Sequence, residues 1–302
     1  MRVIEDNEVR KNLSMKDAIE TIEGILRSVS KNQFLSPPRH YFKNKNGSLA
    51  FTIGGDLGEG VIGFRVYDTF PTKIKHEQFV TVFDAKNGRL KGVVTGDYIG
   101  AARTGAIGGV AIKYLSNPDS QTLGVIGSGK QAETQIYAAV AVRPIRFIKV
   151  FSRNSSNLET FISDISKMLP GIKIMAAESA REAVDNCDIV VTATTSSTPV
   201  IESSWLKLGC HVNSVGPKFK NRNELDIETA LGSQYIYSDS VAQLKNYPSE
   251  HFLSGTPAYD NIRELYTGPL AGRKTEDRTL FLSVGLSGTE PAIANILLDG
   301  DA

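Results

Sequence analysis

The spacing of hydrophobic and polar positions changes along the chain. Residues 14–31, SMKDAIETIEGILRSVSK, place apolar side chains three or four positions apart behind a Ser14 and Asp17 start that resembles a capping box. This spacing predicts an amphipathic helix. Between Tyr41 and Phe83, short runs rich in β-branched and aromatic residues are separated by Gly, Asp and Asn. These runs predict a mostly antiparallel sheet, so the first third of the chain is expected to be α+β.

From residue 122 onward, predicted strands and helices alternate. The strands are 122–126, 146–151, 172–175 and 188–193, and the helices are 130–142, 156–168 and 179–185. This alternation is typical of βαβ units, which form a parallel sheet covered by helices on both faces. The last segment, 279–299, predicts a strand, a turn and a helix that returns to the first domain.

The expected fold class is α/β. We expect a Rossmann-type doubly wound parallel sheet at 116–275 and an α+β domain built from both chain ends, 1–115 with 276–302. The length of 302 residues and the 41% hydrophobic content fit two domains with sizeable cores.

Composition narrows the possible classes of protein. The net charge is +1 and no basic stripe appears, so we expect no nucleic-acid partner. No apolar run reaches the roughly 20 residues that span a bilayer, and the first residues do not resemble a secretory signal. We therefore expect a cytoplasmic protein without a membrane partner. Cys187 and Cys210 are expected to be buried free thiols, and no cysteine spacing suggests a metal site.

A glycine loop follows the strand predicted at 122–126. The stretch LGVIGSGKQAET, 123–134, has the order strand, glycine turn, Ala-rich helix. Gly127 permits the turn, Gly129 lets the backbone approach a pyrophosphate, and the small Ala132 keeps helix and strand close. The open N–H groups and the dipole at the start of the helix favour an anion. The stretch therefore predicts a dinucleotide site, with a bare tight turn as the alternative.

The end of the second strand of this series reports on the type of cofactor. An acidic residue there binds the 2′-hydroxyl of NAD, but this chain has VFSRNSS. Ser152, Arg153 and Asn154 instead offer groups that suit the 2′-phosphate of NADP. We therefore expect NADP(H) to be preferred, with NAD(H) possible. Arg153 could instead be a solvated charge at the end of a strand.

Three arginines stand in apolar surroundings. Arg103 is the one charged residue between Asp97 and Lys113, in an Ala/Gly-rich predicted helix. A buried guanidinium needs an anionic partner, which is either a protein carboxylate or a ligand. Arg39 follows SPP and Arg65 lies within the strand-like VIGFRVY. Together the three suggest a clamp for one carboxylate.

An ordered set of motifs resembles the ornithine cyclodeaminase/mu-crystallin family over nearly the whole chain. The motifs are PPR at 37–39, GFRVYDTFP at 63–71, AARTGA at 101–106, GVIGSGKQA at 124–132, VTATTSSTPV at 191–200, NSVGPKFKNRNELD at 213–226 and ELYTGPLAGRKTEDRTLFLSVGLS at 264–287. The resemblance implies a split substrate-binding and dimerisation domain beside a Rossmann domain, an active site between them, and a homodimer. It also implies hydride exchange at a carbon that bears a nitrogen and a carboxylate, on a small amino or imino acid.

The resemblance implies roles for individual residues. Arg39 and Arg103 match the family's carboxylate-binding arginines, and Thr104 matches a position beside the nicotinamide. The matching motifs add further expected cofactor contacts at Ser128, Gln131, Thr192, Ala193, Thr194 and Val215.

Two positions depart from the family pattern. Arg65 stands where most members have a lysine that contacts the substrate; an arginine keeps the charge but stays protonated, so it can only position the substrate. Lys218 stands where ornithine cyclodeaminase has a catalytic aspartate, which argues against ornithine cyclisation. Lys218 is the candidate proton donor, or else a solvated loop lysine. His40 is a weaker acid/base candidate.

Three functions follow as hypotheses. The leading one is an NADP(H)-dependent oxidoreductase that acts at the α-carbon of an α-imino or α-amino acid, with Lys218 and Arg65 as catalytic candidates and the three arginines binding substrate. The alternatives are a cyclodeaminase that releases ammonia from ornithine or lysine, and a cofactor-bound, non-catalytic binding protein like mu-crystallin.

Overall fold

The computed structural model describes residues 2–70, 78–247, 249–268 and 270–300 and divides the chain into two compact units. The first unit contains 1–106 and 285–302, and the second contains 107–284. The sequence placed these boundaries at 115 and 276. The second boundary differs because the strand β17 (Thr279–Leu282) pairs within the large parallel sheet. The first differs because the structure divides the helix α3 (Tyr98–Leu115) between the two units, after residue 106.

The first unit is built on a sheet with the strand order β1-β7-β6-β5-β4-β2, to which β3 adds by pairing with β4. The strands are β1 (Arg2–Ile4), β2 (Phe34–Leu35), β3 (His40–Asn44), β4 (Gly47–Asp56), β5 (Val61–Asp68), β6 (Phe79–Asp84) and β7 (Leu90–Thr95). All neighbours are antiparallel except β1 and β7. The mostly antiparallel sheet predicted from the sequence is therefore present, although the last residue of the GFRVYDTFP motif lies outside the described residues.

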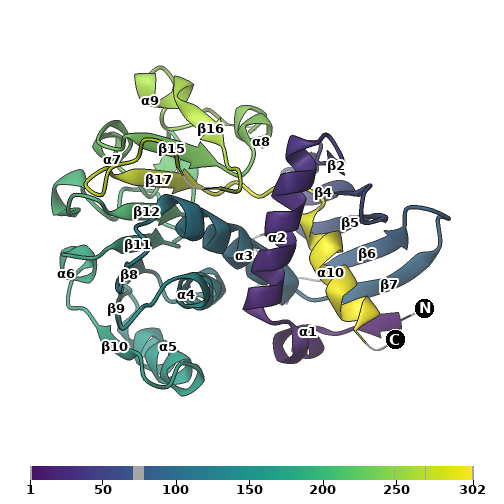
Figure 1. Cartoon of the computed structure of the whole chain (residues 1–302), viewed down its shortest axis with the longest axis horizontal. Helices are drawn as coiled ribbons and strands as arrows, with labels where there is room; N and C mark the ends of the chain where they lie inside the picture. Colours follow the sequence, from purple (N-terminus) through teal and green to yellow (C-terminus); the bar gives the residue numbers. More distant parts are fainter. Residues whose placement is uncertain (1, 71–77, 248, 269, 301–302) are drawn as a thin grey trace. The chain divides into compact units, whose positions relative to one another are not determined.

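Helices from both chain ends cover one face of this sheet. The helices that lie entirely within the first unit are α1 (Asp6–Asn12), α2 (Met15–Ser30) and α10 (Thr289–Asp299). Ser14 caps α2 by accepting from the backbone N–H of Asp17 at 3.4 Å, as its sequence suggested. Figure 1 shows α10 beside α2, and α10 packs on β4, β5 and β6. The C-terminal segment therefore completes a core that the first hundred residues begin.

The second unit contains an eight-stranded sheet with the order β10-β9-β8-β11-β12-β17-β15-β16, and every pairing in it is parallel. Its other strands are β8 (Thr122–Ile126), β9 (Phe147–Phe151), β10 (Lys173–Ala176), β11 (Ile189–Thr192), β12 (His211–Ser214), β15 (Tyr235–Ser238) and β16 (Ile262–Glu264). A separate antiparallel hairpin joins β13 (Lys218–Phe219) to β14 (Arg222–Asn223).

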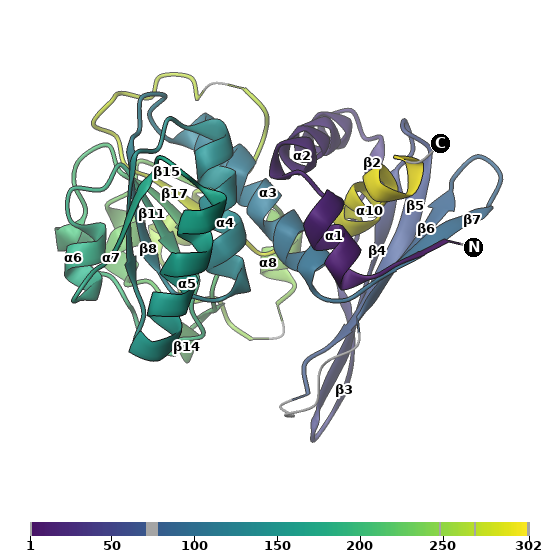
Figure 2. The ribbon, with the colours of Figure 1, turned by 90° about the horizontal axis from the view of Figure 1, so that it is seen from below.

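Helices cover both faces of the parallel sheet. They are α4 (Lys130–Val142), α5 (Ser155–Met168), α6 (Ala180–Val184), α7 (Ile227–Leu231), α8 (Val241–Lys245) and α9 (Pro257–Asp260), with a short 3-10 turn at Ser203–Trp205. Figure 2 shows α4 and α5 on one side of the sheet and α6 and α7 on the other. The Rossmann-type doubly wound α/β fold predicted from the sequence is confirmed.

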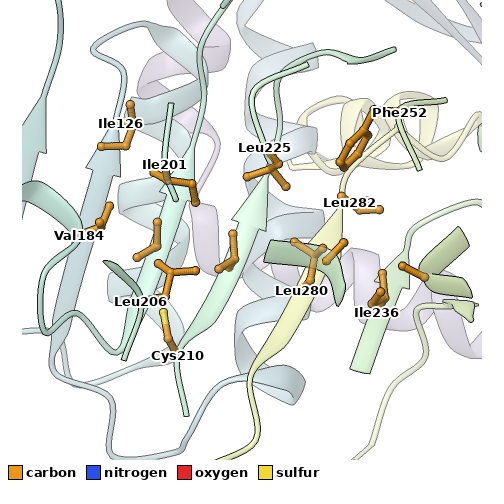
Figure 3. Close-up of a cluster of buried hydrophobic side chains, with 14 of the residues drawn as sticks. Ile126, Val184, Ile201, Leu206, Cys210, Leu225, Ile236, Phe252, Leu280 and Leu282 are labelled. Carbon is orange, nitrogen blue, oxygen red and sulfur yellow. The ribbon is translucent and has the colours of Figure 1, made fainter. Parts of the chain in front are cut away.

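Two apolar cores follow from the alternation of strand side chains. Leu123 and Val125 of β8 pack beneath α4 and α5, whereas Ile126 belongs to the core on the opposite face. Figure 3 shows that second core, where Leu280 and Leu282 of β17 lie with residues from β8 and β15. Cys187 and Cys210 are buried free thiols within it. None of the described helices is long and apolar enough to cross a membrane.

Candidate active site

The glycine loop connects β8 to α4. Gly127 has a φ of +122°, and a β-carbon there would lie 2.4 Å from the carbonyl oxygen of Ala193, so only glycine fits. Gly129 is the N-cap of α4 and makes no side-chain cap, while a β-carbon on it would meet nothing within 4 Å. Ala132 is fully buried in the core beneath α4. The loop thus leaves open space before a helix N-terminus, an arrangement that accepts a phosphate.

A cavity of about 630 Å³ lies at this loop. It is lined by 126–129, 151–154 and 193–196, together with 198–200, Asn157 and Ala180. The chain runs outward from β8 to β10 and then returns to β11 on the other side of β8, so the strand order reverses between β8 and β11. Ligands of doubly wound sheets bind at the carboxyl ends of the strands at such a point. The size and place of the cavity suit a dinucleotide.

Polar side chains of Ser128, Ser152, Arg153 and Asn154 line this cavity. Gln131, which was expected at the cofactor, does not line the cavity; its Oε1 atom is buried without a hydrogen-bond partner within the described part of the chain. The hydroxyl of Ser128 donates to that of Ser152 at 3.0 Å, which joins the glycine loop to the end of β9. Arg153 lines the cavity with an exposed side chain, and Asn154 caps α5 by accepting from the N–H of Asn157.

In the first unit, two of the three arginines share one buried carboxylate. Arg103 Nη2 lies 2.6 Å from Glu290 Oε1, and Arg65 Nη1 lies 2.9 Å from the same oxygen. Burial alone would raise the pKa of Glu290, but the two guanidinium groups lower it to about 2. The sequence allowed two kinds of anionic partner for Arg103, a protein carboxylate or a ligand. The structure shows a protein carboxylate, Glu290 of α10.

Arg39 approaches the same cluster through Gly285. Its Nη2 donates to the Gly285 carbonyl at 3.3 Å, and its Nη1 donates to the hydroxyl of Tyr67 at 3.3 Å. Gly285 has a φ of +87°, and a β-carbon there would lie 2.1 Å from Arg39 Nη2 and 2.6 Å from Arg103 Nη1. Two guanidinium groups thus come close to one backbone position, where only glycine leaves room.

Arg65 is held by groups of its own unit. Besides Glu290, it donates from Nη2 to the Gln78 side chain at 2.6 Å and stacks on the Tyr67 ring at 4.5 Å. These contacts orient the guanidinium and occupy part of its hydrogen-bonding capacity within the first unit. The described contacts thus bring the three guanidinium groups near one another, and a concentration of guanidinium groups favours an anionic ligand.

Lys218, on β13 of the second unit, is buried at 2% exposure rather than solvated. Its Nζ donates to the Gly216 carbonyl at 2.7 Å. Burial lowers the pKa of Lys218 to about 8, and the carboxylates of Glu224 and Asp239 oppose that shift. A lysine with this pKa can release a proton near neutral pH.

The other residues expected at the cofactor lie in different surroundings. Ala193 and Thr194 line the cavity. Thr192 and Val215 do not; the hydroxyl of Thr192 donates to Glu224 at 2.8 Å, and the backbone N–H of Val215 donates to the Thr192 carbonyl. Thr192 therefore does not contact the cavity itself but binds Glu224, whose carboxylate also binds the cavity residue Thr194.

Two expected residues lie in the first unit. The Thr104 hydroxyl donates to the Gly100 carbonyl within α3 at 2.9 Å. His40 is exposed on β3, which gives no support to an acid/base role. In the described ranges, no group of three or more His, Cys, Asp or Glu side chains could hold a metal ion.

Sequence reasoning missed two fully buried carboxylates, those of Glu290 and Glu224. Glu290 is the one acidic residue between Asp277 and Asp299, within a mostly apolar segment, and this isolation was a usable signal. Glu224 ends the polar stretch KFKNRNE and carried no such signal, yet it is fully buried. Only the tertiary structure shows that its carboxylate organises the end of the parallel sheet.

The fold and the loop define a class: an α/β protein whose doubly wound parallel sheet carries a dinucleotide-type glycine loop at its switch point. Within this class the assignment is specific. Residues 2–299 match the model of the ornithine cyclodeaminase/mu-crystallin family, and the chain belongs to that family.

Three relatives illustrate the likeness. The chain is 28% identical to a Delta(1)-pyrroline-2-carboxylate reductase of Bacillus cereus, over 99% of this chain and 96% of the relative. A structure of Thermococcus litoralis Delta(1)-pyrroline-2-carboxylate reductase with NADH and L-proline has a TM-score of 0.90 at 29% identity, covering 99% and 97% of the two chains. An archaeal alanine dehydrogenase dimer with bound NAD has a TM-score of 0.86 at 25% identity, covering 98% and 94%.

Proposed function

We propose that this protein is an NADP(H)-dependent oxidoreductase that transfers hydride at the α-carbon of an α-imino or α-amino acid. The observation that carries the proposal is the approach of the Arg39 and Arg103 guanidinium groups to the same backbone position, Gly285. The cavity at the glycine loop supplies a place for the cofactor. Relatives named as reductases of a cyclic imino acid, one of them with NADH and L-proline bound, support this reaction class.

A bound nicotinamide would supply the hydride for the imine carbon, or accept it in the reverse direction. Arg39 and Arg103 bind the substrate carboxylate, which fixes the orientation of the α-carbon. Arg65 shares Glu290 with Arg103, so it helps to orient Arg103, and it does not itself exchange protons. Arg65 is therefore a positioning residue in the proposed reaction.

Lys218 supplies the proton. As hydride adds to the imine carbon, the electron pair of the C=N bond moves to nitrogen, and the nitrogen takes a proton from the ammonium group of Lys218. The lysine is left as a neutral amine until solvent reprotonates it. The pKa of Lys218, about 8, makes both forms accessible near neutral pH.

A pH profile tests the role of Lys218. We expect kcat for imine reduction to be highest below about pH 8 and to fall as the pH rises through that value, because a smaller fraction of Lys218 then carries the proton that it must donate. Asp239 and Glu224 raise the pKa of Lys218, while the pKa of nearby His251 is lowered by burial to about 3, so His251 stays neutral across this range.

The matching variant is Lys218→Met, which keeps the volume and removes the proton. Its kcat should drop by roughly 10²-fold or more, and the loss of rate above pH 8 should disappear. Wild-type kcat with an unchanged profile in Lys218→Met would exclude Lys218 as the proton source.

For the cofactor, we propose a preference for NADP(H) over NAD(H). Ser152, Arg153 and Asn154 line one end of the cavity, and Arg153 extends its side chain there without a carboxylate at the strand end. A guanidinium beside hydroxyl and amide groups suits a 2′-phosphate. The relatives with bound NADH and NAD make NAD(H) the alternative.

Arg153→Ala tests this preference. We expect the Kd for NADPH to rise by roughly 10- to 100-fold and the Kd for NADH to change by less than about threefold, because only NADPH carries the 2′-phosphate. Titration of each cofactor by fluorescence measures both values. Equal effects on the two cofactors, or tighter NADH binding by the wild type, would reject the preference.

The reaction itself is tested by NADPH and NADH oxidation with cyclic imines, and with 2-oxo acids supplied with ammonia or methylamine. Consumption of the cofactor supports the proposal and ranks the substrates. Ammonia release from ornithine or lysine, with no net cofactor consumption, would instead show a cyclodeaminase. Cofactor binding without turnover of any substrate would show a binding protein like mu-crystallin.

We also propose a homodimer that forms through the first unit. Strand pairing places Ile53 of β4, Phe64 of β5 and Thr81 of β6 on one face of the sheet, opposite the face that carries Arg65 and Glu290. Ile53 is 47% exposed and Phe79 on the same face 38%. An apolar sheet face of this kind favours association, and the archaeal alanine dehydrogenase relative is a dimer.

Ile53→Glu should convert the dimer to a monomer, because it places a charge within the apolar face. Size-exclusion chromatography with light scattering measures the mass. The matched control is Leu208→Glu in the second unit, at an exposed apolar position, which should leave the mass unchanged. A monomeric wild type, or a dimeric Ile53→Glu variant, would contradict this interface.

A further inference from the structure

Glu224 is a fully buried carboxylate that receives five hydrogen bonds within the described residues and forms no ion pair there. Its Oε1 accepts from the Thr192 hydroxyl at 2.8 Å, the Ser214 hydroxyl at 2.9 Å and the Gly216 N–H at 2.5 Å. Its Oε2 accepts from the N–H and the hydroxyl of Thr194, at 3.0 and 2.9 Å. So many donors on one buried group indicate a built site.

The geometry requires a carboxylate. One backbone N–H, which cannot rotate away or reverse its role, points at each oxygen: that of Gly216 at Oε1 and that of Thr194 at Oε2. A glutamine would turn its NH₂ group toward one of these two donors in either orientation of the amide. A β-carbon on Gly216 would lie 2.2 Å from Glu224 Oε2, so the backbone approaches the carboxylate as closely as glycine allows.

The groups that Glu224 holds belong to the candidate active site. Thr194 lines the cofactor cavity, and the backbone carbonyl of Glu224 accepts from the N–H of Val200, which lines it as well. Both ends of the cavity wall 194–200 are therefore tied to this one residue. Thr192 and Ser214 end the strands β11 and β12, so the anchor stands at the carboxyl edge of the sheet.

Glu224 also anchors the hairpin that carries Lys218. The hairpin strands end at Asn223, so Glu224 follows directly, and its carboxylate binds the N–H of Gly216 at the start of the turn. The carbonyl of Gly216 in turn accepts from Lys218 Nζ at 2.7 Å. One carboxylate thus connects the cofactor wall to the group that would supply the proton.

We propose that Glu224 is a positioning residue, which holds the wall 194–200 for the cofactor and the Gly216 turn for Lys218. This inference rests on the proposed function in that it assigns Lys218 a role in the reaction. Its effect on the cofactor cavity stands on geometry alone. Glu224 also places a negative charge near Lys218, as Asp239 does, while the nearby His251 is neutral.

Glu224→Gln and Glu224→Asp separate geometry from charge. In Glu224→Gln we expect the Kd for NADPH to rise at least about tenfold, and the fall of kcat at high pH to begin at a lower pH, because the charge that favours protonated Lys218 is lost. In Glu224→Asp the shorter side chain should weaken NADPH binding while the pH profile stays near that of the wild type. A role limited to stability would not shift a pH profile.

A folded Glu224→Gln protein with NADPH affinity within twofold of the wild type, or with an unchanged pH profile, would overturn the inference. If Glu224→Gln does not fold, the double variant Thr192→Val with Ser214→Ala decides, since it removes two hydroxyl donors and keeps both backbone donors. It should bind NADPH at least about threefold more weakly, and wild-type affinity would overturn the inference. If the wild type binds NADPH but reduces no imine, the proposed function fails while the binding comparison still tests Glu224.

Discussion

Arg103→Ala should reduce kcat/KM for imine reduction by about 10³-fold, equivalent to roughly 4 kcal/mol of transition-state stabilisation. The substitution removes one of the two guanidinium groups that approach Gly285, and with it the orientation of the substrate carboxylate. NADPH affinity should be unchanged, because all residues that line the cofactor cavity belong to the second unit. Steady-state kinetics and cofactor titration measure the two effects separately.

Two further variants control this experiment. Arg89→Ala removes an exposed arginine of the same unit and should leave kcat/KM unchanged. Arg103→Lys keeps the charge without the bidentate geometry and should recover only part of the rate. Because Arg103 also pairs with Glu290, Arg103→Ala should lower the free energy of unfolding by roughly 3 kcal/mol, so the assay needs a temperature at which the variant is folded. A kcat/KM within threefold of the wild type would reduce Arg103 to a structural ion pair.

The second large effect concerns the glycine loop. Gly127→Ala should lower the free energy of unfolding by about 2 kcal/mol or more and prevent cofactor binding, because alanine rarely adopts a φ of +122° and its β-carbon would overlap the Ala193 carbonyl. Denaturant unfolding and NADPH titration measure the two quantities.

Gly129→Ala is the matched variant two residues away. Its φ of −103° suits alanine and the added methyl meets no protein atom, so stability should change by less than about 0.5 kcal/mol. The methyl would nevertheless occupy the space through which a pyrophosphate approaches the start of α4, and NADPH binding should weaken by roughly tenfold or more. Normal binding by Gly129→Ala would mean that the loop is a tight turn and holds no phosphate.

Much of the second unit was predictable because its information is local. The bounds predicted for β8 and α4, 122–126 and 130–142, are those of the structure. A buried strand followed by glycines and an apolar helix face has few other ways to satisfy its backbone and bury its side chains. The antiparallel sheet of the first unit was equally readable from its short β-type runs and glycine turns.

The hairpin of β13 and β14 was not predictable, because its strands have two residues each and a polar sequence. Lys218 is buried there only because the Gly216 turn and the surrounding elements enclose it. The position of the boundary near the C-terminus, after residue 284, also depends on contacts between distant segments. Strand β17 pairs with β12 and β15, and hydrogen bonds between distant segments leave no trace in a local pattern.

The sequence by itself determined the alternating strands and helices of the doubly wound sheet, the glycine loop and the family, since each rests on periodicity or on motifs read along the chain. Only the tertiary structure decided which charges meet. Glu290 reaches Arg65 from 225 residues away and Arg103 from 187, and Glu224 gathers donors from the ends of two strands. A buried charge is stable only beside its partners, and those partners are brought together by packing of the whole chain rather than by their neighbours in sequence.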